Sequence, residues 1–142
     1  MQRTDHPVEE HIASLPDDVR ADMARLDAEI SRVMAGDQRV LWEGKFWGGT
    51  DQNIIGYGVY SYKGRSGASG EWFVVGLAAQ KNYITVYGVA PSDDTAEAKA
   101  ILDRLGKAKI GRSTVSFKRL SDIDVPTLLG LVDRASTAAP TS

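Results

Sequence analysis

The segment from residue 40 to 89 constrains the fold most, because it is rich in aromatic and β-branched residues interrupted by glycines. Four strands fit this segment: Val40 to Trp47, Ile54 to Tyr62, Trp72 to Gln80 and Tyr83 to Val89. Lys81-Asn82 is a tight turn between the last two strands. Short turns between successive strands favour antiparallel pairing, so the segment predicts an antiparallel meander.

Helices are predicted before this meander. The first is a short helix from Val8 to Ala13. The second follows a Ser14 cap and a Pro16 in its first turn. Apolar residues recur at spacings of four and three along it, which gives one buried face over about five turns before Gly36. They are Val19, Met23, Leu26, Ile30 and Val33.

Further elements follow the meander. A helix is expected from Thr95 to Leu105, with Gly106 as its C-terminal cap. A strand is expected from Thr114 to Phe117, and Asp124 caps a last helix. This order predicts an α+β fold: an antiparallel five-stranded sheet with N-terminal helices, one inserted helix and a C-terminal helix.

Length and composition predict one soluble domain. With 142 residues the chain has a common domain size. We expect a flexible N-terminus over residues 1–7, a domain over 8–135 and a disordered tail over 136–142. The chain has no cysteine, no signal peptide and no apolar stretch that could span a membrane, which predicts a cytoplasmic protein. Its net charge of −2 argues against nucleic-acid and membrane-surface binding.

A basic segment lies near the C-terminus, between Asp103 and Asp122, with six basic side chains and no acidic one. Its glycine-marked loop, free backbone N–H groups and small hydroxyl side chains suit an anion. An anion there would contact Lys109, Arg112 and Ser113, with Lys81 from the hairpin. The alternative is a loop kept soluble by its charges, with cations that complement the end of the preceding helix.

Three segments resemble the YdhG-like family of small bacterial domains. They are residues 12–20 (IASLPDDVR), 80–87 (QKNYITVY) and 111–117 (GRSTVSF). The resemblance covers 8–135 and implies a compact α+β domain; some members are described as frataxin-like iron chaperones. Two positions depart from the family: its Gly-Met-Pro is Gly44-Lys45-Phe46 here, and its hairpin His is Tyr83.

Metal binding is an alternative that would use carboxylates, because the chain has no cysteine and its two histidines lie near the N-terminus. The candidate residues are Glu9, Glu10, Asp17 and Asp18. A solvated helix face with acids near its start explains the same cluster.

The aromatic residues of the predicted strands alternate onto both faces of the sheet. If helices cover one face only, aromatics on the other would form a binding surface or a dimer interface. No catalytic motif and no cofactor-binding motif is present. The sequence therefore predicts a non-catalytic, cofactor-free module that binds a small anionic ligand or a protein partner on the open face. Trp42 would lie inside that site, with Lys81, Tyr83 and Arg112 at the rim. An iron chaperone and a structural homodimer are the alternatives, so monomer and homodimer both stay open.

Overall fold

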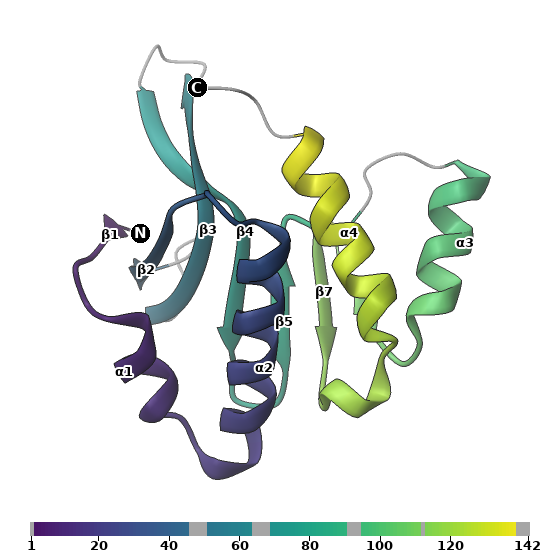
Figure 1. Cartoon of the computed structure of the whole chain (residues 1–142), viewed down its shortest axis with the longest axis horizontal. Helices are drawn as coiled ribbons and strands as arrows, with labels where there is room; N and C mark the ends of the chain where they lie inside the picture. Colours follow the sequence, from purple (N-terminus) through teal and green to yellow (C-terminus); the bar gives the residue numbers. More distant parts are fainter. Residues whose placement is uncertain (1, 46–50, 64–68, 91–94, 112, 139–142) are drawn as a thin grey trace.

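A computed structural model describes residues 2–45, 51–63, 69–90, 95–111 and 113–138. Four helices and seven strands follow one another along the chain (Figure 1). The helices are α1 (Val8–Ala13), α2 (Asp17–Val33), α3 (Ala96–Leu105) and α4 (Val125–Ala138). The strands are β1 (Gln2–Arg3), β2 (Arg39–Lys45), β3 (Asp51–Lys63), β4 (Ser69–Ala79), β5 (Ile84–Tyr87), β6 (Lys109–Ile110) and β7 (Thr114–Phe117). A short 3-10 turn, Leu120–Asp122, precedes α4.

All seven strands form one antiparallel sheet in the order β1-β2-β3-β4-β5-β7-β6. The predicted α+β architecture, the meander and the helix positions are confirmed. The predicted number of five strands is wrong, because β1 and β6 add a strand of two residues at each edge. Residues 1–7 were expected to be flexible, but Gln2 and Arg3 pair with Glu43 and Trp42.

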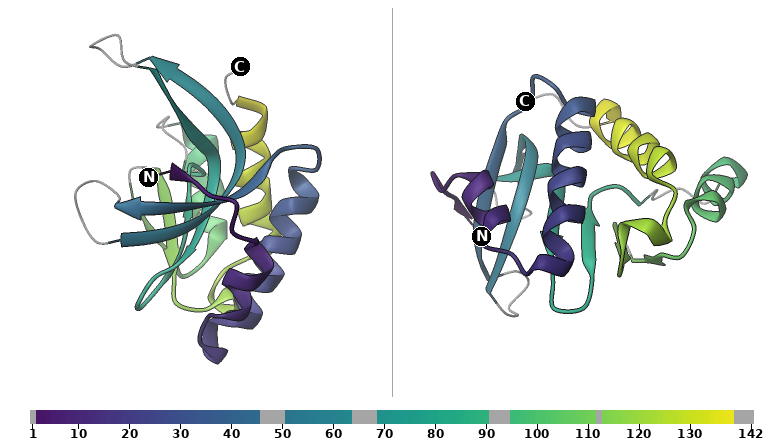
Figure 2. Two further views of the ribbon diagram at one scale, coloured as in Figure 1. Left: turned by 90° about the vertical axis from the view of Figure 1, so that its left-hand side faces the viewer. Right: turned by 60° about the horizontal axis from the view of Figure 1, so that its bottom comes forward.

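Helices α1, α2 and α4 lie on one face of the sheet (Figures 1 and 2). Met23, Leu26 and Ile30 of α2 point towards the sheet with the four-and-three spacing seen in the sequence. They pack against alternate strand residues to form the main core. Strand residues of this core include Leu41, Ile55, Leu77, Val86, Val115 and Phe117.

One buried polar group connects the helices to the sheet. The Asp27 carboxylate of α2 accepts hydrogen bonds from the Tyr57 hydroxyl at 2.6 Å and from Arg39 Nε at 2.9 Å. Arg39 also pairs with Glu9 of α1 at 2.7 Å. Burial and the neighbouring carboxylate raise the pKa of Tyr57 well above its usual range, so its hydroxyl stays a donor. The network links α1, α2, β2 and β3.

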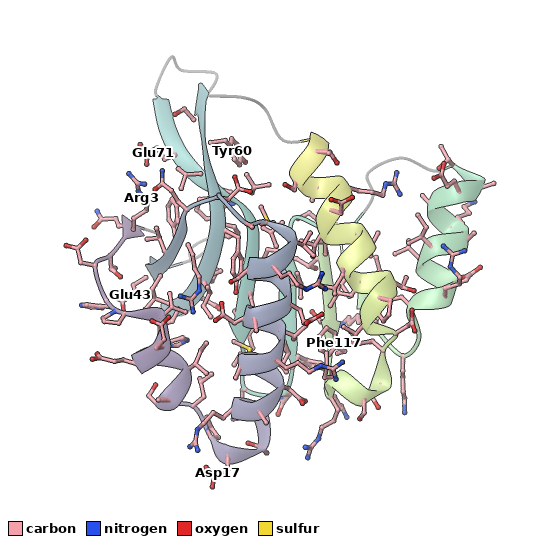
Figure 3. The ribbon with its side chains drawn as sticks, in the orientation of Figure 1. Arg3, Asp17, Glu43, Tyr60, Glu71 and Phe117 are labelled. Atoms are coloured by element: carbon pink, nitrogen blue, oxygen red, sulfur yellow. The ribbon has the colours of Figure 1, made fainter. Side chains whose placement is uncertain are left out.

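The strand alternation changes at Gly58, where the backbone φ is +75°. Tyr57 belongs to the main core, whereas Val59, two residues later, packs on the opposite face. The β3–β4 hairpin therefore curls, as Figure 2 shows. The Arg3–Glu71 ion pair, at 2.9 Å, connects the first strand to the fourth and confirms that this hairpin bends back (Figure 3).

Helix ends follow the sequence in two of three places. Asp124 caps α4 by accepting from the Thr127 N–H, and Gly106, with a φ of +106°, is the C-terminal cap of α3. The predicted Ser14 cap is wrong, because Ser14 ends α1 and its hydroxyl donates to His11 O at 2.6 Å. Pro16 occupies the N-terminal position of α2 instead.

Candidate binding surface on the sheet

The sheet face opposite the helices has a second, smaller core. Its buried members are Trp42, Ile54, Phe73, Ala78 and Tyr87. The rings of Trp42 and Phe73 lie 5.7 Å apart and meet edge to face. We predicted Trp42 as a contact inside an open site, but its exposed fraction is 2%. The curled β3–β4 hairpin explains the difference, because it brings Phe73 and Trp72 over Trp42.

A row of hydrogen-bonded polar side chains continues this face beyond the aromatic rings. Gln80 Nε2 donates to the Tyr87 hydroxyl at 2.8 Å and lies 3.4 Å from Gln52 Oε1. The Thr85 hydroxyl donates to Gln80 Oε1 at 2.8 Å and lies 3.0 Å from Ser116 Oγ. These side chains satisfy one another, so the row is a rigid platform.

Lysines surround the end of this platform. Lys109 is paired with Ser116 across β6 and β7. Ile84 is paired with Phe117, so the preceding Tyr83 and the following Lys118 lie side by side at this end. By strand alternation Lys109, Lys118 and Tyr83 project on the same face as Ser116. Lys81 and Lys107 flank them in sequence. We call Lys81, Lys107, Lys109 and Lys118 the lysine patch.

The positive charge of the lysine patch is not neutralised by ion pairs with the described residues. None of its four ammonium groups forms an ion pair with another residue of the described ranges. All four lysines are exposed. Tyr83 beside them is a large hydrophobic residue that is exposed, at 38%. Cations together with an exposed aromatic ring are suited to hold an acidic partner.

The structure divides the predicted site. Lys81, Tyr83 and Lys109 lie at one end of β5 and β7. Ser113 lies at the other end, since Tyr87 pairs with Thr114. The Ser113 carbonyl already accepts from Gly88 N at 2.7 Å. Arg112 lies outside the described residues, so its predicted role is not placed.

Four residues of this surface were not assigned to a site from the sequence. Lys107 and Lys118 were seen only as members of the basic segment, and Thr85 and Ser116 only as members of the segments that resemble the YdhG-like family. The available signal was the alternation of polar and apolar residues in β5 and β7, where Thr85 follows Ile84 and Ser116 follows Val115.

Two of the four acidic residues considered for metal binding form separate ion pairs. Glu9 pairs with Arg39, which lowers the pKa of its carboxyl, and Asp17 pairs with Arg20 at 2.7 Å. The Asp18 carbonyl lies 3.5 Å from an Arg119 nitrogen. Glu10 is exposed on α1. Over the described ranges, no three His, Asp or Glu side chains are grouped so that they could hold a metal ion.

No proton-transfer pair was found among the described residues of this face. Burial raises the pKa of Tyr87, so its hydroxyl is protonated at neutral pH. The two histidines lie elsewhere, with His6 Nδ1 2.8 Å from Glu43 at the other edge of the sheet.

Comparison with protein-family models, curated proteins and solved structures finds no match to this chain. The resemblance to the YdhG-like family therefore stays a prediction. In the part of the chain that the structure describes, no helix is both long and apolar enough to cross a membrane.

Proposed function

We propose that this protein is a non-catalytic binding module that holds an acidic segment of a partner protein at the lysine patch. The observation that supports this most is the set of four exposed lysines without an ion-pair partner among the described residues. Two of them, Lys109 and Lys118, lie beside the exposed ring of Tyr83 on the sheet face opposite α1, α2 and α4. The net charge of the chain is −2, so this is a local cationic surface.

The arrangement suits recognition because the platform is already ordered. Thr85, Ser116 and Gln80 hold one another, so binding would order few further side chains. The acidic groups of the segment would approach the lysines at the rim, which accelerates association and lowers affinity at high salt. Tyr83 would supply an apolar contact with a hydroxyl donor.

A protein segment fits this surface better than a small ligand. The patch extends over β6, β7 and the β4–β5 turn, whereas one hollow lined by described residues lies between α3 and α4. Small ligands prefer concave sites. Addition of a partner strand at the edge is disfavoured, because β6 has two residues and one of them is lysine.

The test is fluorescence anisotropy with a labelled Asp- and Glu-rich peptide. We expect saturable binding that weakens as ionic strength rises above about 0.1 M. The double variant Lys109→Glu/Lys118→Glu should weaken binding at least tenfold, because like charges then face each other. Inorganic phosphate, added at the same total charge as the peptide, should displace the peptide poorly if the partner is an extended segment.

A matched control tests whether location matters. Arg25→Glu/Arg32→Glu makes the same charge change on the exposed side of α2, across the sheet from the patch. It should leave peptide affinity within about twofold. Equal losses of peptide affinity in both double variants would show that only the net charge of the protein matters. That result would refute the proposed site. Stronger binding of a labelled oligonucleotide than of the peptide would refute the partner class.

A further inference from the structure

A groove lies between α3 and α4, two helices whose positions Figure 1 shows. Its volume is about 390 Å³, within the range of small-molecule sites. It is lined by Ile101 and Arg104 of α3 and by Pro126, Thr127, Gly130 and Arg134 of α4. The floor is mainly apolar, with a guanidinium on each helix.

Gly130 is the unusual residue of this groove. It lies in the interior of α4, where glycine destabilises a helix relative to alanine. Its φ is not positive, and a Cβ placed there would meet no atom within 4 Å. Neither backbone conformation nor internal packing therefore requires glycine. A residue that lowers helix stability without a structural need for it points to a functional reason. The exposed backbone of Gly130 lies in the groove.

The charge of Arg104 indicates which kind of ligand the groove could bind. Arg104, in the last turn of α3, forms no ion pair with any residue of the described ranges. Its position complements the helix dipole and still leaves its N–H donors available. Thr127 is engaged, since its hydroxyl donates to Asp124. Arg104 is thus the donor that would fix the orientation of a guest.

We propose that this groove binds a small amphipathic carboxylate. The carboxylate would accept two parallel hydrogen bonds from Arg104, and the apolar chain would lie on Ile101, Pro126 and the exposed backbone of Gly130. From Pro126 to Arg134 the floor of α4 extends about 12 Å, which sets the length of the chain. This site is independent of the lysine patch.

Octanoate is the probe for this proposal. Titration followed by ¹⁵N amide shifts should show one saturable site, with the largest shifts at Ile101, Thr127 and Gly130. 1-Octanol, which lacks the charge, should bind at least tenfold more weakly, and so should octanoate to Arg104→Ala. The matched control Arg25→Ala, on the exposed side of α2, should leave affinity unchanged.

Substitutions of Gly130 should change the melting temperature and the octanoate affinity in opposite directions. Gly130→Ala should raise the melting temperature by about 3 °C because alanine favours the helix, while it weakens octanoate binding. Gly130→Leu should fill the groove, abolish binding and keep a folded circular dichroism spectrum. Full octanoate affinity in folded Gly130→Leu would overturn the proposal. Equal affinity for octanol, shifts centred on Tyr83 and Lys109, or no saturable shift would overturn it as well.

Discussion

The two faces of the sheet are buried by different means. On one face, helices α1, α2 and α4 cover the strands, and the buried Asp27 carboxylate connects α1 and α2 to β2 and β3. On the other face, strand curvature brings Trp72 and Phe73 over Trp42 without a helix. The difference shows that a curled hairpin can close a small core without a helix.

Trp42→Ala should have the largest effect, because it tests whether the helix-free face has a true core. We expect a loss of about 4 kcal/mol in the free energy of unfolding, comparable to Leu77→Ala on the helix-covered face. Chemical denaturation would measure both. A loss under about 1 kcal/mol for Trp42→Ala would show that this face contributes little to stability.

Trp42→Phe sharpens the same comparison. The indole N–H of Trp42 is buried and has no hydrogen-bond partner among the described residues. Phenylalanine removes that unsatisfied donor and keeps most of the ring, so it should cost far less than alanine. A loss as large as that of Trp42→Ala would instead indicate a hydrogen bond through the indole nitrogen.

Asp27→Ala should cost about 3 kcal/mol, because it leaves the half-buried Arg39 and the buried Tyr57 hydroxyl without their acceptor. Thermal or urea unfolding would measure the loss. Asp18→Ala is the matched control, since Asp18 is exposed in the first turn of the same helix; it should cost about 0.5 kcal/mol. Similar losses in the two variants would contradict a special role for the buried network.

Gly56→Ala should destabilise by about 2 kcal/mol through overpacking of the helix-free face. An added Cβ would clash with Trp42 Nε1 and would stand 2.9 Å from Phe73 Cβ. Gly130→Ala in α4, where the Cβ meets nothing, is the control and should stabilise instead. Denaturation midpoints of the two variants should therefore shift in opposite directions. Stabilisation by both would contradict close packing at Trp42.

The smallest expected effect is a pH dependence that separates the two histidines near Glu43. Burial lowers the pKa of His11 from 6.5, so the unfolded chain binds its proton first and stability falls as pH drops below 6.5. The hydrogen bond to Glu43 raises the pKa of His6, so its contribution is present below pH 6.5 and is lost as pH rises through the raised pKa.

Unfolding between about pH 7.5 and 5.5 would measure this. As pH falls, His11→Gln should gain stability relative to the wild type, and His6→Gln should lose it. Parallel pH curves for the wild type and His11→Gln would show that His11 is not held neutral.

Much of the fold could be predicted because long elements have strong patterns. The α2 apolar face and the four strands of the meander follow directly from side-chain periodicity. The two-residue strands β1 and β6 have no periodicity to detect, so the predicted sheet lacked both edges. The Ser14 cap failed because a serine between two close helices can end the first as well as begin the second.

The site was predicted less well, for a geometric reason. Alternation places Trp42 on the helix-free face, but it contains no information about the curl at Gly58 that buries it. Proximity in the basic segment grouped Lys109 with Ser113, whereas the β5–β7 register separates Ser113 from Lys81 and Tyr83. Register depends on pairing across the sheet, which local patterns do not determine.

The most direct test of the proposed binding surface is a map of amide shifts on titration with the acidic peptide. Saturable shifts should concentrate at Tyr83, Thr85, Lys109, Ser116 and Lys118 and should disappear in Lys109→Glu/Lys118→Glu. The exposed side of α2 should show none. Shifts centred on the helix-covered face, or no shift at an excess of peptide in low salt, would contradict the proposal that the lysine patch holds an acidic partner.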